Sequence, residues 1–180
     1  MDKLISELQK ISTDFQQSFG SLSDKQINWK PAAESWSVGQ CVEHLIKSNE
    51  MLYDVIGKIA DGTKQNSFLE NWSPLSGFFG GFLIRSLKSD SKKFKAPTQA
   101  IVPPSEIDPH IIEIFEAHQT EVIEKIRSTE NADWKKTIVT SPFLQIITYS
   151  LKDAYAAMVE HEKRHFRQAK RVVETDGFPK

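Results

Sequence analysis

The chain has 180 residues and a formal net charge of -1 at pH 7, with 39% hydrophobic and 26% charged residues. This length fits a domain that buries its own core, and the near-zero net charge excludes bulk attraction to nucleic acid or to an anionic membrane. Cys41 is the single cysteine and no apolar stretch is long enough to span a bilayer, so we expect one domain over residues 1–180, in the cytoplasm and without a signal peptide.

The first predicted helix rests on apolar residues that recur at spacings of three and four. This spacing places them on one face of an amphipathic helix. Gly20 and the polar run that follows it end the helix, and Pro31 marks a loop over residues 28–35. The apolar residues of this face are Leu4, Leu8, Ile11, Phe15 and Phe19.

The second predicted helix begins at a capping box formed by Ser37 and Gln40 and runs to about Ala60. Residues 61–104 are broken by glycines and prolines, so we expect an irregular connection with one short helix over residues 78–87. A connection of this length often carries a function. The apolar stripe of the second helix is Val38, Cys41, Leu45, Leu52, Ile56 and Ile59.

Two further helices are predicted in the second half of the chain. Asp108 followed by Pro109 is typical of a helix start. After an irregular connection over residues 131–149, Ser150 caps the last helix, which runs to about Glu174. Four helices joined by short and long connections predict an all-α fold, an antiparallel four-helix bundle with long irregular connections. The third helix has Ile112, Phe115, Val122 and Ile126 on its apolar face.

A polar patch interrupts the apolar stripe of the last helix. His161, Glu162 and His165 all lie within about 60° of the stripe's centre. Buried polar groups cost free energy unless they are paired, so these side chains need partners. His161 and His165 are four residues apart, which stacks two imidazoles one turn apart as a pair of ligands for one metal ion.

A third ligand is expected from another helix, because two ligands rarely suffice. His44 lies in the middle of the second helix, at the edge of its apolar stripe, and is the best candidate. A single histidine beside a core is more often a hydrogen-bonded structural residue. The metal-site prediction therefore depends on the three histidines together.

The last helix also matches the short zinc-peptidase pattern, in which Glu162 would be the general base between His161 and His165. We do not favour a peptidase, because only fifteen residues follow His165 and the usual downstream third ligand has little room. The structural alternative for Glu162 is a residue that supports the ligands or forms a salt bridge.

Other features permit a functional interpretation, but a structural one is favoured for each. Cys41 is a candidate thiolate ligand, although a cysteine in a hydrophobic staple usually packs. His118 is interpreted as a surface or flanking residue that could contact substrate, and His110 as a solvated residue. The basic run 92–95 is too short to indicate nucleic-acid binding. The aromatic segment 78–82 is expected to pack or cap the bundle, and the alternatives are a pocket wall or a subunit contact.

Residues 36–45 and 161–169 resemble the second-helix and last-helix motifs of the DinB-like superfamily, also called the YfiT-like metal-dependent hydrolases. Residues 22–31 and 94–104 resemble two of its connections. The resemblance implies a four-helix bundle with a nickel or zinc ion, held by one histidine of the second helix and two of the last. These positions match His44, His161 and His165. The family includes S-transferases that use bacillithiol or mycothiol, and a homodimer is the expected assembly.

An enzyme is the favoured function. Three histidines leave an open position on a metal ion, where a bound thiol or water loses its proton readily. We predict a metal-dependent, bacillithiol-type S-transferase acting on small electrophilic molecules, with a hydrolase as the nearest alternative. Glu162 is the predicted catalytic residue, which would orient a ligand or shuttle a proton. The competing class is a non-catalytic metal- or ligand-binding stress-response bundle, which a closed site with Glu162 or Cys41 as fourth ligand would favour.

Overall fold

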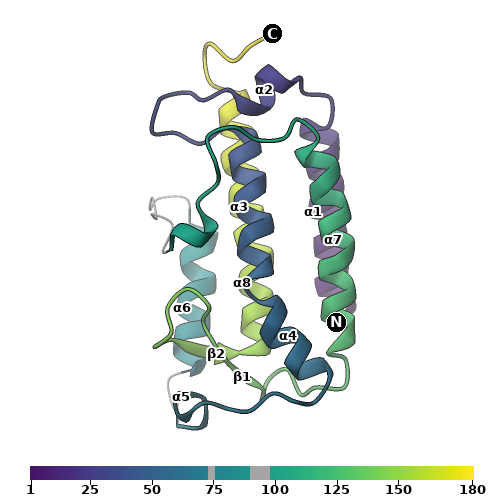
Figure 1. The fold of residues 1–180 in the computed structure, drawn as a ribbon, viewed down its shortest axis with the longest axis vertical. Helices are drawn as coiled ribbons and strands as arrows, with labels where there is room; N and C mark the ends of the chain where they lie inside the picture. Colours follow the sequence, from purple (N-terminus) through teal and green to yellow (C-terminus); the bar gives the residue numbers. More distant parts are fainter. Residues whose placement is uncertain (73–75, 90–97) are drawn as a thin grey trace.

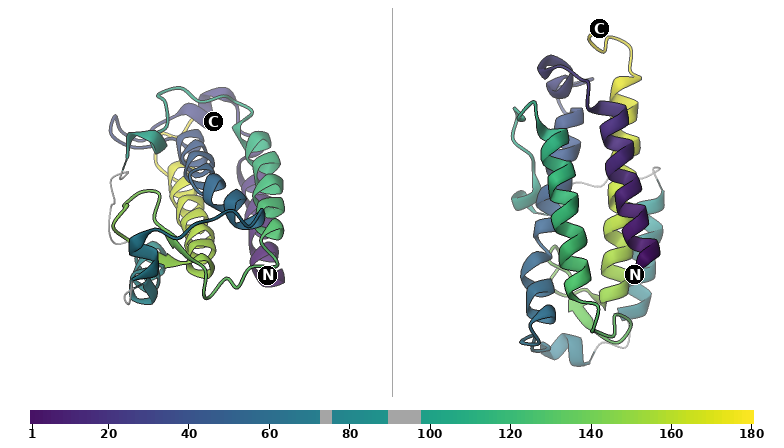
Figure 2. Two further views of the ribbon diagram at one scale, coloured as in Figure 1. Left: turned by 60° about the horizontal axis from the view of Figure 1, so that its bottom comes forward. Right: turned by 90° about the vertical axis from the view of Figure 1, so that its right-hand side faces the viewer.

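A computed structural model describes residues 1–72, 76–89 and 98–180 (Figure 1). Its four long helices form a four-helix bundle, as the sequence predicted. α1 packs against α7 and α8, and α3 packs against the other sides of the same two helices. α1 and α8 run in one direction and α3 and α7 in the other (Figures 1 and 2). The four helices are α1 (Asp2–Phe19), α3 (Val38–Glu50), α7 (Ile111–Ser128) and α8 (Leu151–Val173).

The long connection between α3 and α7 returns the chain to the end of the bundle where α3 began (Figure 1). It carries α6, which packs along the outer side of α8, and η1, which packs against α3. Because this crossover is long, α3 and α7 can lie side by side and still run in the same direction. The shorter elements are α2 (Asp24–Asn28), α4 (Tyr53–Ala60), α5 (Phe68–Asn71), α6 (Ser76–Lys88), η1 (Gln99–Ile101), β1 (Ile138–Thr140) and β2 (Thr148–Ser150).

Aromatic packing joins three helices of the bundle around Phe15. The Phe15 ring centroid lies 4.8 Å from that of Phe115 on α7 and 5.1 Å from that of Phe166 on α8. Such tilted aromatic pairs add about 0.5–1.5 kcal/mol beyond the burial of their area. The apolar face predicted for the first helix is confirmed, except that Ile5 is buried in place of Leu4.

Helix starts agree closely with the predicted caps. Gln40 N–H donates to Ser37 Oγ over 3.1 Å and Ser37 N–H donates to Gln40 Oε1 over 3.2 Å, which completes the capping box of α3. Ser150 Oγ accepts from Asp153 N–H at the start of α8. The predicted short helix in the long connection is also present as α6.

The sequence predicted one continuous second helix to about Ala60, and this was wrong. The structure has two helices there, α3 and α4. A turn at residues 51–52 separates α3 from α4, because Leu52 N–H bonds the carbonyl of Asn49, three residues back. This shorter bond tightens the chain and changes the helix direction. α7 begins at Ile111, slightly later than predicted, since Asp108 Oδ1 accepts the His110 N–H in a preceding turn.

The connection 131–149 was predicted to be irregular, and this was wrong in part. β1 and β2 pair antiparallel within it, with Val139 opposite Tyr149. Both strands are rich in β-branched and aromatic residues, which favour extended backbone. α2 was also not predicted.

Two segments singled out in the sequence lie wholly or partly outside the described residues. The basic run 92–95 lies outside the described residues, as does the start of the family-like stretch 94–104. Among the helices described, none is long and apolar enough to cross a membrane.

Candidate metal centre

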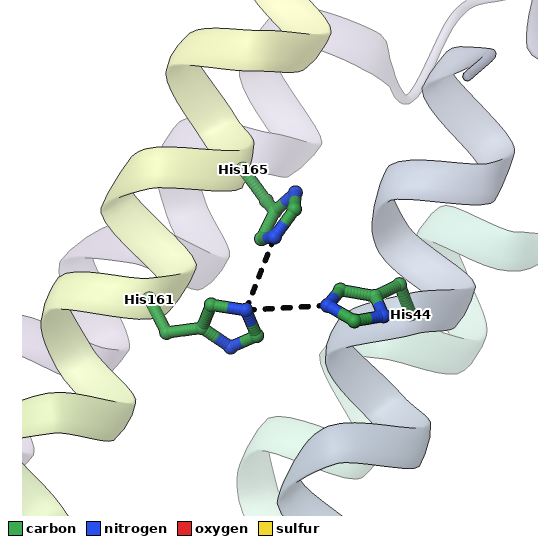
Figure 3. A group of neighbouring side chains, drawn as sticks. All are labelled: His44, His161 and His165. Atoms are coloured by element: carbon green, nitrogen blue, oxygen red, sulfur yellow. Dashed lines mark hydrogen bonds between the residues drawn. The ribbon is translucent and has the colours of Figure 1, made fainter. Parts of the chain in front are cut away.

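The three predicted ligands converge at one point between α3 and α8 (Figure 3). His161 Nε2 lies 3.2 Å from His44 Nε2 and 3.1 Å from His165 Nε2. One ligand atom from each of these three histidines lies within 4.8 Å of the other two. The i, i+4 spacing on α8 and the position of His44 on α3 therefore produce the cluster that the sequence predicted.

These separations fit a shared metal ion. Two nitrogens at 2.0–2.1 Å from a tetrahedral zinc ion lie about 3.3 Å apart. His44 Nδ1 lies 2.8 Å from the carbonyl oxygen of Ile101, which can only accept a hydrogen bond. The proton of His44 is therefore on Nδ1, and the lone pair of its Nε2 faces the other two rings.

Burial keeps the three imidazoles neutral, which is the protonation state that binds metal. Desolvation lowers the pKa of His161 to about 3, with smaller contributions from His44 and Arg164. Desolvation also lowers the pKa of His44, against the hydrogen bond to Ile101, which raises it. The pKa of His165 is well below 6.5 for the same main reason, with His161 and His44 adding to the shift.

Two neighbours orient the ligand rings. The half-buried Trp36 stacks on His165 at 5.7 Å between ring centroids and packs against His44 at 4.8 Å. The Ile101 carbonyl comes from η1, at the end of the long connection between α3 and α7. Groups of this kind fix the tautomer and direction of a ligating histidine. The connection thus has a definite structural role at the site.

Glu162 is fully buried and belongs to a second polar cluster. Its Oε1 accepts from Asn49 Nδ2 on α3 at 2.8 Å, and its Oε2 accepts from Gln119 Nε2 on α7 at 2.6 Å. Burial raises the pKa of Glu162 to about 7, and the two amide hydrogen bonds partly oppose the rise. Both carboxylate oxygens are therefore engaged by amides of neighbouring helices, and a catalytic role for Glu162 remains a prediction.

His118 is buried, which corrects its assignment as a surface or flanking residue. Its Nε2 lies 3.4 Å from Asn49 Nδ2 and its Nδ1 lies 3.3 Å from the Tyr53 hydroxyl. Burial lowers the pKa of His118 to about 4, so the ring is neutral at pH 7. His110 is exposed, as expected for a solvated residue.

Cys41 lies outside the histidine cluster. It is fully buried, and burial raises the pKa of its thiol to about 12, which leaves it protonated at neutral pH. Within the described residues, the cluster with metal-ligand spacing contains the three histidines and not Cys41. The packing interpretation of this cysteine is therefore the better supported one.

Sequence reasoning missed Asn49 and Gln119. For Gln119 a signal was available, because it lies four residues after Phe115 and three before Val122, both on the apolar face of α7. A polar residue inside an apolar stripe needs a buried partner, which is the argument that identified Glu162. Asn49 carries the same signal, because it lies four residues after Leu45 and three before Leu52 in the apolar stripe predicted for the second helix.

The fold and the site together define a four-helix bundle with a candidate metal centre, whose three histidines come from its second and last long helices. The model of the DinB superfamily matches residues 7–169, and the chain belongs to this superfamily. Its fold is similar to that of YfiT from Bacillus subtilis, a structure described as "a probable metal-dependent hydrolase with an unusual four-helix bundle topology". The two chains are 16% identical with a TM-score of 0.61, over 99% of this chain and 88% of that one, and this likeness shows the fold alone. None of the curated proteins compared with the chain matches it.

Proposed function

We propose that this protein is a metal-dependent enzyme acting on small electrophilic molecules, with one divalent ion held by His44, His161 and His165. The observation that supports it is the convergence of three neutral imidazole nitrogens, with separations of 3.1 and 3.2 Å, on one point. An ion bound by three histidines keeps an open position at which a thiol or water is acidified. Imidazole ligands suit nickel and zinc, and we propose one of these two ions.

The surrounding residues would prepare the site for this chemistry. His44 donates to Ile101, which holds its ring in one tautomer, and Trp36 covers one side of His165. Burial of His44 and His165 and desolvation of the half-buried His161 keep protons from competing with the ion at neutral pH.

Thiol transfer of the bacillithiol type is the proposed reaction, and hydrolysis is the alternative. The resemblance of residues 36–45 and 161–169 to the motifs of a family that includes such S-transferases supports thiol transfer. The similarity to YfiT, described as a probable metal-dependent hydrolase, gives the alternative additional weight. We also propose that residues 1–180 form one domain, and that the protein works in the cytoplasm as a homodimer.

Metal analysis of protein purified without a histidine tag tests the site. We expect one divalent ion per chain, and loss of tight binding in His161→Ala and in His165→Ala with helicity retained. His110→Ala is the matched control, because it removes an exposed histidine outside the cluster. Unchanged metal content in both site variants contradicts the assignment.

Activity assays then separate the classes. Metal-loaded protein is incubated with several small thiols and a model electrophile, beside an ester-hydrolysis control. Conjugation supports a transferase, ester hydrolysis alone supports a hydrolase, and neither activity supports a non-catalytic binding bundle. If Glu162 transfers a proton, Glu162→Gln lowers the turnover of fully metal-loaded protein about 10²–10⁴-fold. If Glu162 only supports the fold, turnover per folded, metal-loaded protein is unchanged.

A further inference from the structure

α5, α6 and the β1–β2 turn meet at one end of the bundle (Figures 1 and 2), and we call the exposed apolar side chains that they carry the apolar corner. Its four aromatic side chains have exposed fractions between 59% and 78%, and Ile146 is 80% exposed. Isolated exposed apolar residues are common, but several large exposed apolar side chains at one end of a bundle indicate an interaction site. The apolar corner consists of Phe68, Leu69, Trp72, Phe78, Phe82, Leu144 and Ile146.

Contacts between the three segments fix them beside one another. Glu70 on α5 accepts through Oε1 from Thr140 N–H at 2.8 Å and from Thr140 Oγ1 at 3.0 Å, which joins α5 to β1. α6 packs against β2 and α8, and a groove of about 500 Å³ separates Phe68 and Leu69 from the segment 140–145. The segments that carry the exposed apolar side chains are therefore held in place at this end of the bundle by defined contacts.

The size of this surface matches one side of a specific protein interface. An aromatic side chain has about 150–250 Å² of surface, so the four aromatic residues, at their exposed fractions, expose about 420–700 Å². The aliphatic residues bring the total to about 800 Å², which is one partner's share of a standard interface. The largest apolar patch of an ordinary monomer is about 300–600 Å².

Glycines on α6 indicate that a second helix covers this surface. Packing within the chain explains the glycine at position 80, because a Cβ there would lie 2.5 Å from Asp153 Oδ2 on α8. Packing within the chain does not require glycine at Gly77 or Gly81, since a Cβ at either position would meet no atom within 4 Å. Glycine inside a helix costs about 0.5–1 kcal/mol relative to alanine. Two glycines one turn apart allow another helix backbone to approach closely.

We propose that the apolar corner is the interface of the homodimer proposed above, with α6 of one copy crossing α6 of the other; this inference rests on that proposed assembly. Gly77 and Gly81 would provide the crossing point, and Phe78 and Phe82, whose rings stack at 6.5 Å, would lie beside it. A two-fold contact uses the same surface on both copies, so one apolar corner supplies both halves. A lipid surface would cover the aromatic residues too, but it gives no reason for the two glycines.

The oligomeric state of the full chain tests this interface, by sedimentation velocity over a range of micromolar concentrations. We expect a dimer for the wild type, and a dissociation constant raised at least about tenfold in Gly81→Leu and in Phe82→Asp. A Cβ at Gly81 meets no atom within 4 Å in the single chain, so we expect Gly81→Leu to block the crossing with the helicity of the monomer retained. Ile114→Asp is the control, since Ile114 is an exposed apolar residue of α7, outside the apolar corner, and should leave the dimer intact.

Several results overturn the proposal. A wild-type monomer at all concentrations does so, and so does a dimer that Gly81→Leu leaves unchanged in a protein with normal helicity. Co-sedimentation of monomeric wild type with phosphatidylcholine vesicles assigns the surface to lipid instead. Metal content is measured in the same samples and should not change, so failure of the interface and failure of the metal site are distinguishable.

Discussion

Removing the side-chain amide of Asn49 should cost the metal-free protein about 3 kcal/mol of unfolding free energy. Asn49 is 2% exposed and donates over 2.8 Å to the carboxylate of Glu162, which is fully buried. A hydrogen bond to a charged group contributes about 1.5–3 kcal/mol to the free energy of unfolding. The carboxylate oxygen left without a donor in the variant adds part of its desolvation cost. The weaker contact of Asn49 with His118, at 3.4 Å, adds little. The loss is a large part of a typical stability of about 5–15 kcal/mol, but the fold should survive.

A double-mutant cycle measures how much of this loss belongs to the buried carboxylate. In a Glu162→Leu background, Asn49→Ala should cost less than about 1 kcal/mol, because no buried charge then requires the amide. The expected coupling is about 2 kcal/mol, measured by urea unfolding at pH 8 with a chelator present. The pKa of Glu162 is about 7, so the carboxylate is ionised at that pH. Effects that add to within about 0.5 kcal/mol would refute the reasoning, since independent sites add in this way.

Two further predictions concern stability. The metal-free protein should lose stability as the pH falls below 6.5, the ordinary pKa of histidine. The reason is that histidines of the unfolded chain become protonated in this range, whereas those of the folded cluster stay neutral. His161 alone, with its pKa lowered to about 3, contributes a slope of about 1.4 kcal/mol of unfolding free energy per pH unit. Glu162, with its raised pKa, opposes this trend, so the urea series from pH 8 to pH 5 is run in Glu162→Gln, and a flat profile would contradict the burial argument. Gly39→Ala should destabilise the fold by about 1–3 kcal/mol, because its Cβ would lie 2.8 Å from Ile27 Cγ2. Gly57→Ala, with no atom within 4 Å, should stabilise α4 by about 0.5–1 kcal/mol, and equal effects at the two glycines would contradict this packing.

The sequence predicted those parts of the fold that local periodicity determines. The apolar face of α1 and the caps at Ser37 and Ser150 depend on residues within one or two turns, and both were found. The break between α3 and α4 was missed because the apolar stripe continues across it, from Leu45 to Leu52 and Ile56. β1 and β2 were missed because each strand is three residues long, too short for a period of two to be recognised.

The candidate site was predictable only in part, for a related reason. His161 and His165 share a helix, so their spacing determines their relation. His44 had to be joined to them through packing between helices, and the family motif supplied that link. The carbonyl of Ile101 has no side-chain signal, since a backbone oxygen is the same in every residue. The sequence could therefore indicate the ligands but not the groups that orient them.

The buried carboxylate of Glu162 and the histidine cluster connect the same two helices, α3 and α8. α3 contributes His44 and Asn49, and α8 contributes His161 and Glu162, so each helix takes part in both the histidine cluster and the amide–carboxylate contact. Apolar packing alone tolerates small shifts along a helix, whereas a 2.8 Å hydrogen bond does not. We therefore expect Asn49→Ala to weaken zinc binding about 10–100-fold, the usual effect of losing a group that supports a metal site, although Asn49 is not one of the three ligands. The control is Ile126→Val, which trims a fully buried residue at the C-terminal end of α7. Titration with a competing chelator provides the measurement, and equal affinities in the wild type and Asn49→Ala would show that the carboxylate contact does not determine the geometry of the site.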